Sequence, residues 1–318
     1  MRVERVEKDE ACQLQARLER ALRGRPIEAF LPRARALAGF DAVVDASLDQ
    51  EQARLAVQKL LAGARLLPAE IEVLETGIRL ARPALRVETE VLPRAPAVRL
   101  DEAARASIEA MLPGVASVGR DWHSAFATAF QVAPRVLVTN EHVTRRLLQD
   151  PEGLAQGRFV AHFGACSRPG KSTVPILRVL ETHPREDVAL IELVSEGPLS
   201  HGLRLAWEPA LRREEEVLVV GYPIYNLGNP PWVDELFENL YGVMRASPGE
   251  VLGGEANKLY HDCTTLPGSS GSPVFGMKTG LVVGIHSSGQ FAYRNTAVST
   301  RALREEVRMR DCVSTWIR

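Results

Sequence analysis

A change in the spacing of the apolar residues, between residues 90 and 115, is the feature that most constrains how this chain can fold. Before it, apolar residues recur every three or four positions, as Leu14, Leu18 and Leu22 do, which is the period of an amphipathic helix. After it, short apolar runs are separated by Gly, Pro, Asn and Asp, which is typical of the strands of a barrel or sandwich. The pattern therefore predicts a multidomain α and β protein.

The 318 residues are enough for two domains. We predict a bundle of four to six short helices over residues 1–90, a linker containing prolines over 91–105, and an all-β domain over 106–318. Pro68 suits the first turn of a helix, and Pro83 marks where that helix stops. A short helix is expected at about residues 101–111. Beyond residue 115, helix is expected to return only near the end, at about residues 300–309.

Composition and charge argue against several partners. The net charge of −1 gives no support for nucleic acid. The charged start, MRVERVEKDEACQL, lacks the apolar core of a signal peptide, and no apolar run reaches the roughly 18 residues that a membrane span needs. We therefore expect a cytoplasmic protein whose partner is neither nucleic acid nor a membrane.

Cysteine spacing and ligand motifs predict no cofactor and no metal. The four cysteines lie far apart without a CxxC pair, so reduced thiols are expected, with one disulfide left open. Known metal-ligand spacings are missing from the sequence. The segment 165–173, ACSRPGKST, fits a relaxed phosphate-binding pattern, but Pro169 removes an amide and a strand follows where a helix is needed. We predict a hairpin loop there.

Ser270 lies on a turn rich in small residues, GSSGSPVF, which begins at Gly268 and continues into an apolar run. A serine hydroxyl is a poor nucleophile unless a base lies within hydrogen-bond reach and amide donors face the oxyanion that forms. The amides of Gly268 and Ser270 can supply these donors if the turn directs both into one hollow. A side chain at position 268 would resist that backbone conformation.

His142 and Asp187 are the candidates for the base and for the acid that orients it. His142 follows the strand-forming run PRVLVTNE, so its ring can lie at a strand end, and Asp187 precedes the apolar run VALIEL. Each of the other six histidines is more simply a surface or core residue, and Asp187 alone is equally well explained as a charge at a strand edge. An α/β-hydrolase would instead have the order Ser, acid, His, with a helix after the serine.

Five motifs in order, LVTNEHV, EDVALIEL, VVGYP, GSSGSPVF and GIHSSG, make residues 115–310 similar to a bacterial trypsin-like serine peptidase of the chymotrypsin fold. The resemblance implies a double β-barrel with Ser270 as nucleophile, His142 as general base and then acid, and Asp187 holding the imidazole tautomer. It also implies that the amides of Gly268 and Ser270 form the oxyanion hole.

The resemblance extends to the residues around the substrate. It implies that Ser287 supports the acid of the triad and that Ser287–Gly289 pair with an extended substrate. Ser269 departs from the family pattern, because digestive members carry there an aspartate that pairs with a new N-terminal amine. The run SAFATAFQV (124–132) likewise replaces a glycine-rich strand.

The pocket for the residue before the cleaved bond is assigned by the same resemblance. The residues implied to bind substrate are Thr264, Thr265, His286, Ser287, Ser288 and Gly289. No carboxylate lies at the base of this pocket, so a preference for Lys or Arg is not expected. His286 and Thr265 match a pocket histidine and threonine of glutamyl endopeptidases, with Arg294 close in sequence, which implies cleavage after acidic residues. The alternative is a packed His286 and a pocket for small or apolar side chains.

The segment LLPAEIEVLETGIRLARPAL (66–85) is similar to effector-associated modules of bacterial defence systems. This implies an adaptor that docks onto a protein partner, whereas an inhibitory or stabilising prodomain is the simpler alternative. For the whole chain we expect an intracellular serine endopeptidase that acts on proteins or peptides. The rival is a catalytically silent peptidase fold that binds peptides or serves as a scaffold.

Overall fold

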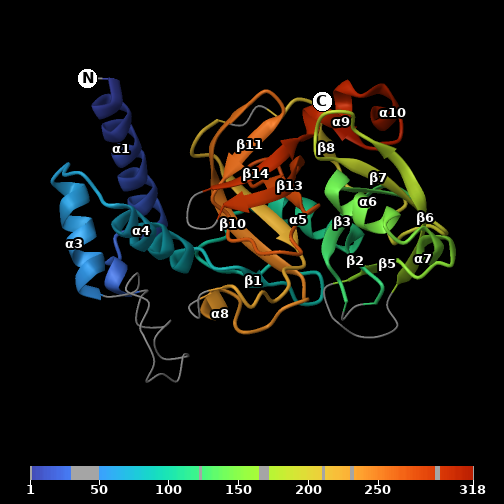
Figure 1. The fold of residues 1–318 in the computed structure, drawn as a ribbon, viewed down its shortest axis with the longest axis horizontal. Coiled ribbons are helices and arrows are strands. Elements are labelled where there is room, and N and C mark those ends of the chain that lie inside the picture. The colour runs from blue at the N-terminus through green and yellow to red at the C-terminus, as the bar shows by residue number, and fades with distance from the viewer. Residues whose placement is uncertain are drawn as a thin grey trace. The chain divides into compact units, whose positions relative to one another are not determined.

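The computed structural model describes residues 2–29, 50–121, 124–164, 172–209, 212–229, 233–290 and 294–317. The chain divides into two compact units (Figure 1). The helical unit comprises Met1–Pro83, Leu227–Leu240 and Phe291–Tyr293, and the barrel unit comprises Ala84–Asn226, Tyr241–Gln290 and Arg294–Arg318. Most of the predicted hairpin loop, residues 165–171, lies outside the described residues.

The helical unit packs two of its helices through an apolar stripe and a buried ion cluster. Its described helices are α1 (Arg2–Leu22), η1 (Ile27–Ala29), α3 (Gln50–Leu61), α4 (Pro68–Ala81) and α8 (Val233–Leu236). Leu14 and Leu18 are buried, as the helical period predicted. Glu75 of α4 accepts hydrogen bonds of 2.6 and 3.0 Å from Arg17 of α1 and one of 2.7 Å from Arg79. Two guanidinium groups thus compensate one buried carboxylate, which is what burying a charge requires.

Helix α4 begins and ends where its prolines predicted. Pro68 is its first residue, and the Leu67 amide donates to the Glu70 carboxylate at 2.7 Å. This hydrogen bond, together with one from Lys59, lowers the pKa of Glu70. The helix stops at Ala81, two residues before Pro83.

Six antiparallel strands form the first barrel, closed in the order β2-β3-β4-β7-β6-β5. They are β2 (Val115–Gly119), β3 (Ala127–Ala133), β4 (Val136–Thr139), β5 (Val160–Phe163), β6 (Thr173–Thr182) and β7 (Ala189–Leu193). Ala127 and Ala129 belong to the run SAFATAFQV and are buried in the apolar core of this barrel. The methyl groups of both alanines therefore fit inside the closed barrel.

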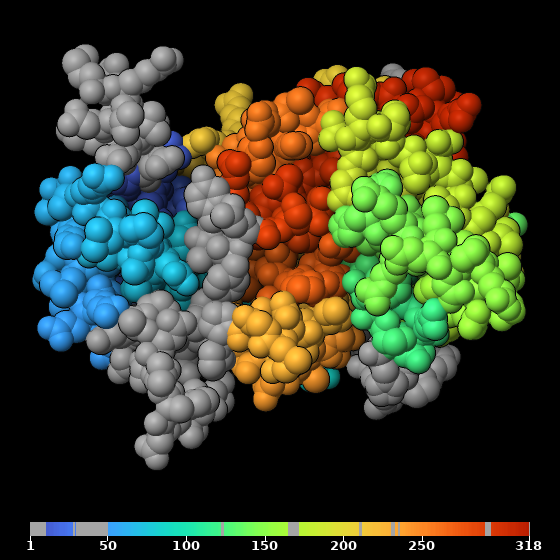
Figure 2. Space-filling view, in the orientation of Figure 1, coloured from blue at the N-terminus to red at the C-terminus, as the bar shows by residue number. Residues whose placement is uncertain are grey.

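The second barrel also has six strands, in the order β12-β9-β10-β11-β14-β13, and pairing of β12 with β13 closes it. They are β9 (Glu216–Gly221), β10 (Arg245–Glu255), β11 (Lys258–His261), β12 (Pro273–Gly276), β13 (Val282–Gln290) and β14 (Arg294–Ser299). Short strands β1 (Leu85–Arg86), β8 (Leu205–Ala206) and β15 (Trp316–Ile317) extend it. The predicted fold class is confirmed: a helical N-terminal region precedes a double β-barrel. The two barrels meet on the face shown in Figure 2, the first in green and yellow and the second in orange and red.

The expectation that helix returns only near the chain end is wrong. The C-terminal helix is present, as α9 (Thr300–Glu305) and α10 (Val307–Arg310), but α6 (Glu141–Leu148) and α7 (Pro151–Ala155) lie between strands of the first barrel. The short helix expected at about residues 101–111 is confirmed as α5 (Glu102–Glu109). Helix α6 forms because Val143 and Leu147, four residues apart, are buried in the core of the first barrel. Helix α7 starts where the Asp150 carboxylate accepts the Gly153 amide at 2.8 Å.

The segment that precedes the first barrel belongs to the barrel unit. The Val87 amide donates to the Met244 carbonyl at 3.0 Å, and the Leu92 and Val98 side chains are buried in the core of this unit. Asp101 accepts the Ala104 amide and so caps α5. The domain boundaries themselves, with a linker over 91–105, stay a prediction.

Candidate active site

His142 lies in the first turn of α6, directly after β4, and not at the strand end itself. Asn140, the residue before the helix, donates from its amide side chain to the Asp187 carbonyl at 2.8 Å. This contact brings the start of α6 to the loop that joins β6 and β7. The His142 side chain is 43% exposed, so a substrate can reach it.

Asp187 lies on the β6–β7 loop and accepts hydrogen bonds on both carboxylate oxygens. Oδ1 accepts the His142 amide at 3.0 Å, and Oδ2 lies 2.8 Å from His142 Nδ1. Oδ2 also accepts the Ser287 hydroxyl at 2.5 Å. Burial alone would raise the pKa of Asp187, but the donors from His142 and Ser287 outweigh it and lower that pKa.

The ionised state of Asp187 fixes the tautomer of His142. A carboxylate only accepts hydrogen bonds, so Nδ1 must carry the proton that lies between the two side chains. The lone pair of a neutral ring is then on Nε2, away from Asp187. His142 is thereby prepared to act as a base.

Ser270 and Ser287 connect this pair to the second barrel. The Ser270 hydroxyl donates to the Ser287 carbonyl at 3.2 Å, while the Ser287 hydroxyl contacts Asp187. Ser287 is at a β-bulge, because the pairing of β13 with β14 shifts between His286 and Ser288. The extra residue leaves its carbonyl free to face the nucleophile and turns its side chain toward the acid. The structure thus brings together the three residues that the sequence singled out.

The turn around Ser270 leaves two amides without an acceptor. The amides of Ser269, Gly271 and Ser272 donate to the carbonyls of Leu266, His286 and Ser269, respectively. Those of Gly268 and Ser270 have no hydrogen-bond acceptor among the described residues. The Pro267 carbonyl accepts the Ile224 amide at 2.8 Å, so the Gly268 N–H, which is trans to it, points the opposite way.

Only glycine fits at position 268. Gly268 has a φ of +89°, and a Cβ there would lie 2.5 Å from the Tyr222 carbonyl oxygen. Both the left-handed backbone and the close approach exclude a side chain. The turn is therefore built around the two free amides.

The predicted pocket residues differ in exposure. Thr264 and His286 are buried, Thr265 and Ser287 are half-buried, and Ser288 and Gly289 are exposed. A Cβ on Gly289 would lie 3.8 Å from Thr265 Oγ1, so these two residues face each other. The Arg294 guanidinium lies 4.0 Å from the centre of the Tyr260 ring, on which it stacks.

His261 is a partner of His286 that sequence reasoning did not identify. Its Nε2 lies 3.2 Å from His286 Nδ1, and its Nδ1 accepts the Cys263 amide at 3.3 Å. Burial, and then the positive charge that His261 and His142 would carry, hold the pKa of His286 well below its ordinary value. His261 must therefore donate from Nε2, which leaves the proton of neutral His286 on its own Nε2. No sequence spacing marks this pair, because only the pairing of β11, β14 and β13 brings it together.

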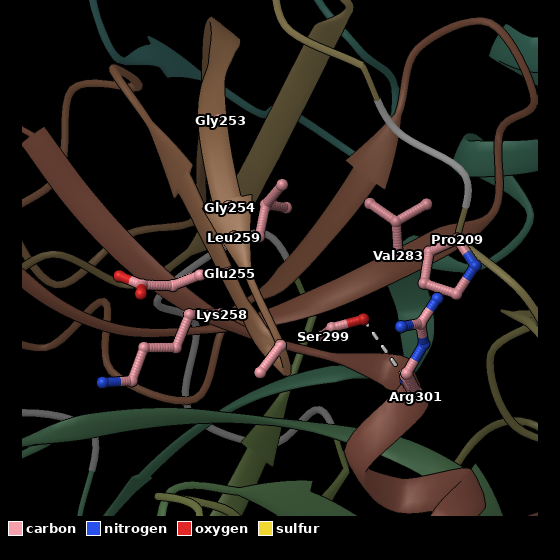
Figure 3. A pocket seen from close by; sticks show the side chains of 10 residues that line it. Pro209, Gly253, Gly254, Glu255, Lys258, Leu259, Val283, Ser299 and Arg301 are labelled. Carbon is pink, nitrogen blue, oxygen red and sulfur yellow. Dashed lines mark hydrogen bonds between the residues drawn. The ribbon is translucent and has the colours of Figure 1, made fainter.

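A separate hollow of about 200 Å³ lies elsewhere on the second barrel (Figure 3), where β10 and β11 approach the start of α9. Lys258, Ser299 and Arg301 border it, and none of its lining residues is a predicted site residue. Within the described ranges, no cluster of three or more His, Cys, Asp or Glu could hold a metal ion. No described helix has the length and apolar content to cross a bilayer.

The chain is similar to a known family and to solved structures. The family model described as a trypsin-like peptidase domain matches residues 127–285. Among solved structures, the inactive form of a serine-to-alanine mutant of Rv3671c from M. tuberculosis is 19% identical over 69% of this chain and 95% of its own, with a TM-score of 0.44. The active form of the Rv3671c protease is 17% identical over 73% of this chain and 97% of its own, with a TM-score of 0.45.

The family match begins at β3 and ends within β13, so it includes strands of both barrels and every predicted residue of the triad. It covers half of the chain. This chain therefore belongs to the trypsin-like peptidase family and is a serine endopeptidase.

Proposed function

We propose that this peptidase cleaves peptide bonds through an acyl-enzyme on Ser270, with His142 as general base and Asp187 as its orienting acid. The observation that carries the proposal is the hydrogen-bonded chain that runs from Ser270 through Ser287 and Asp187 to His142. It links the nucleophile of one barrel to the base of the other.

In the first step Ser270 Oγ attacks the substrate carbonyl carbon while its proton passes to His142 Nε2. The carbonyl oxygen becomes an oxyanion that the amides of Gly268 and Ser270 stabilise. His142 then returns the proton to the leaving amine. A water molecule attacks the acyl-enzyme by the same route, and Ser270 recovers its proton.

The hydroxyl of Ser270 must turn before it reacts, since in the structure it donates to the Ser287 carbonyl. A main-chain N–H of an extended substrate, paired with the strand at Ser287, would compete for that carbonyl. Substrate binding thereby favours donation from Ser270 to His142. Rotation of one serine side chain takes picoseconds to nanoseconds and does not limit the rate.

A fluorophosphonate probe on the full chain tests the assignment of Ser270. We expect one covalent label on Ser270, measured by peptide mass spectrometry, and none in Ser270→Ala. The matched control is Ser272→Ala, because the Ser272 hydroxyl is buried and has no partner among the described residues; that variant should still react. An unlabelled wild-type chain would support the rival reading as a silent peptide-binding fold.

We further infer that the pocket prefers an acidic residue before the cleaved bond. The support is His286, whose Nε2 carries a proton on a ring that His261 orients. An imidazole N–H and the Thr265 hydroxyl could both donate to a substrate carboxylate. A peptide library should then be cut mainly after Glu or Asp, and His286→Leu should lower kcat/KM for Glu by ~10–100-fold while leaving that for Leu unchanged. Cleavage mainly after Leu or Ala would contradict the inference.

The helical unit is proposed to be an adaptor for a protein partner, as in an effector of a bacterial defence system. The support is the exposure of Leu55, Leu61 and Leu67 on and beside α3, at 49%, 63% and 59%, because a protein partner would remove such apolar side chains from water. Leu61→Glu should reduce capture of a substrate protein without changing kcat/KM for a short peptide. Higher peptide activity in that variant would instead favour an inhibitory domain.

The cytoplasmic location expected from the sequence is part of the same proposal. Its support is that Cys12 and Cys312 are free thiols, as is usual in a reducing compartment. Fractionation of cells that express the full chain tests it.

A further inference from the structure

Thr128 connects the first barrel to the turn that carries Ser270. It lies on β3, is fully buried, and makes three hydrogen bonds at this junction. Its amide donates to the Ser270 carbonyl at 2.8 Å, and its hydroxyl donates to the Gly268 carbonyl at 2.8 Å. The same hydroxyl accepts the Tyr222 amide at 3.0 Å.

The two carbonyls that Thr128 holds belong to the two residues whose amides are free. Gly268 and Ser270 each present an N–H without an acceptor among the described residues and have a C=O that Thr128 binds. The carbonyl of a residue lies in the peptide plane that follows it, and its own N–H lies in the plane that precedes it. Thr128 therefore anchors the plane between the two free amides and the plane directly after the second one. One residue of the first barrel thus constrains the backbone next to both amides.

The hydroxyl of Thr128 has only one direction in which to donate. Because it accepts the N–H of Tyr222, its proton is directed to the Gly268 carbonyl. The Thr139 hydroxyl in turn donates to the Thr128 carbonyl at 2.8 Å and holds the strand in place. Gly271 permits this approach, since a Cβ there would lie 2.0 Å from the Thr128 carbonyl oxygen.

The turn over residues 266–272 contains no charged residue. Ser269, next to the nucleophile, is buried and uncharged, and its hydroxyl accepts the Leu266 amide at 3.4 Å. A turn fixed by short hydrogen bonds to neutral groups needs no newly formed charged N-terminus to order it. Thr128 supplies two of these bonds from a closed barrel.

We propose that Thr128 is a positioning residue for the oxyanion hole, which its hydroxyl keeps in the competent conformation. The proposal rests on the function proposed for Ser270 and Gly268. It assigns to Thr128 no contact with the substrate. Its effect is expected in the transition state, where the oxyanion forms, and not in substrate binding.

The test compares Thr128→Val, which keeps the shape and loses the hydroxyl, with Thr128→Ser, which keeps the hydroxyl. The matched control is Thr300→Val, because Thr300 is also fully buried and donates to a backbone carbonyl, that of Ala206, at 2.9 Å. Steady-state kinetics are measured on the full chain below the melting temperature of every variant. A peptide aldehyde, which forms an oxyanion on Ser270, is compared with the peptide alcohol of the same sequence.

We expect Thr128→Val to lower kcat ~10–100-fold with KM within ~3-fold, since displacing an oxyanion donor costs less than the 10²–10³-fold of deleting one. Affinity for the aldehyde should fall by the same factor as kcat/KM, and affinity for the alcohol should not change. Thr128→Ser should keep kcat within ~5-fold of wild type, and Thr300→Val should keep wild-type kcat.

Three results would overturn the proposal: wild-type kcat in Thr128→Val, equal losses in the valine and serine variants, or a loss confined to KM. If Thr128→Val does not fold, Thr128→Ala takes its place, and the same comparison with Thr128→Ser decides. Failure of the wild-type chain to turn over or to react with the fluorophosphonate would instead refute the proposed function. The two failures are therefore distinguishable.

Discussion

The two barrels hold their shares of the candidate site by different means. In the first, the side chains of His142 and Asp187 are 43% and 30% exposed, and one hydrogen bond joins them. In the second, Ser270 and Gly268 lie on a tight turn whose backbone is fixed by buried contacts. Substituting a catalytic side chain of the first barrel should therefore abolish activity with little effect on packing. In the second barrel the same backbone atoms serve activity and stability, so a substitution should affect both.

Replacing His142 by Ala is expected to have the largest effect on activity, and it tests the comparison of the two barrels. Without a base, kcat should fall by ~10⁶-fold, on the scale measured when the serine or histidine of a triad is removed. The melting temperature should change by less than about 3 °C, because the side chain is exposed. Peptide hydrolysis and a thermal melt measure both. A large fall in melting temperature would show that the His142 side chain also contributes to the stability of the first barrel, which would contradict the comparison.

Asp187→Asn should lower kcat by ~10⁴-fold, because an amide in place of the carboxylate no longer selects the tautomer with the proton on Nδ1. Ser287→Ala removes a different donor to the same carboxylate and should cost less, since His142 still has its partner. Kinetics at pH 8 compare the two variants. Equal losses would mean that the Ser287 hydroxyl, and not the carboxylate charge, orients the ring.

The pH dependence of stability offers a second readout on Asp187. Its folded-state pKa lies below the ordinary value of 3.8, so the ionised form stabilises the fold above that pH. This contribution is lost as the pH falls through the folded pKa. The difference in the free energy of unfolding between wild type and Asp187→Asn should therefore be constant from pH 7 to 5 and shrink below about pH 4. Urea unfolding at pH 7 and pH 3.5 checks this.

Gly268→Ala should damage activity and fold together, as the comparison requires for the second barrel. We expect kcat to fall ~10²–10³-fold as an oxyanion donor is displaced, and the melting temperature to fall by about 4–8 °C for about 2 kcal/mol of strain. The matched control is Gly242→Ala, because Gly242 has a similar φ of +69° but open space around it. That variant should be destabilised less and should retain wild-type kcat. Equal kinetics in both variants would contradict the role of the turn.

The sequence predicted most of the helices and strands of the two units. Where the prediction failed, tertiary contacts override the local preference of the residues. Period and prolines located α1 and α4, and apolar runs located strands such as β7 and β9. Strand β10 was only partly predicted, because Pro248 and Gly249 are typical of turns. In the barrel, Pro248 lies opposite Leu218, and Gly249 avoids a Cβ that would lie 2.6 Å from the Cys263 amide. Long-range pairing here overrides local preference.

The candidate site shows the same limit. The motifs located His142, Asp187 and Ser270 because each lies at a distinctive junction of a strand and a polar turn. They could not identify Thr128 or His261, whose roles arise from contacts between distant strands. A buried threonine in a strand and a histidine near a cysteine have no local signature.

His183 gives the smallest expected effect, and it concerns the loop that carries Asp187. Its Nδ1 accepts the amides of Arg185 at 3.2 Å and Glu186 at 2.9 Å, which only the neutral ring can do. Burial lowers the pKa of His183, although the carboxylates of Glu186, Glu305 and Glu306 oppose the shift.

The neutral ring of His183 therefore stabilises the fold above pH 6.5, the ordinary value, and this contribution is lost as the pH falls through the lower folded pKa. His183→Leu removes both the acceptor and the titration, so it should melt a few degrees below wild type at pH 7.5 and approach wild type at pH 5. His201→Gln, at an exposed position, is the control and should follow wild type at both pH values. A difference in melting temperature between wild type and His183→Leu that stays constant with pH would mean that packing alone holds the loop near Asp187. The part of the site on the first barrel would then be fixed by buried contacts, as the turn on the second barrel is.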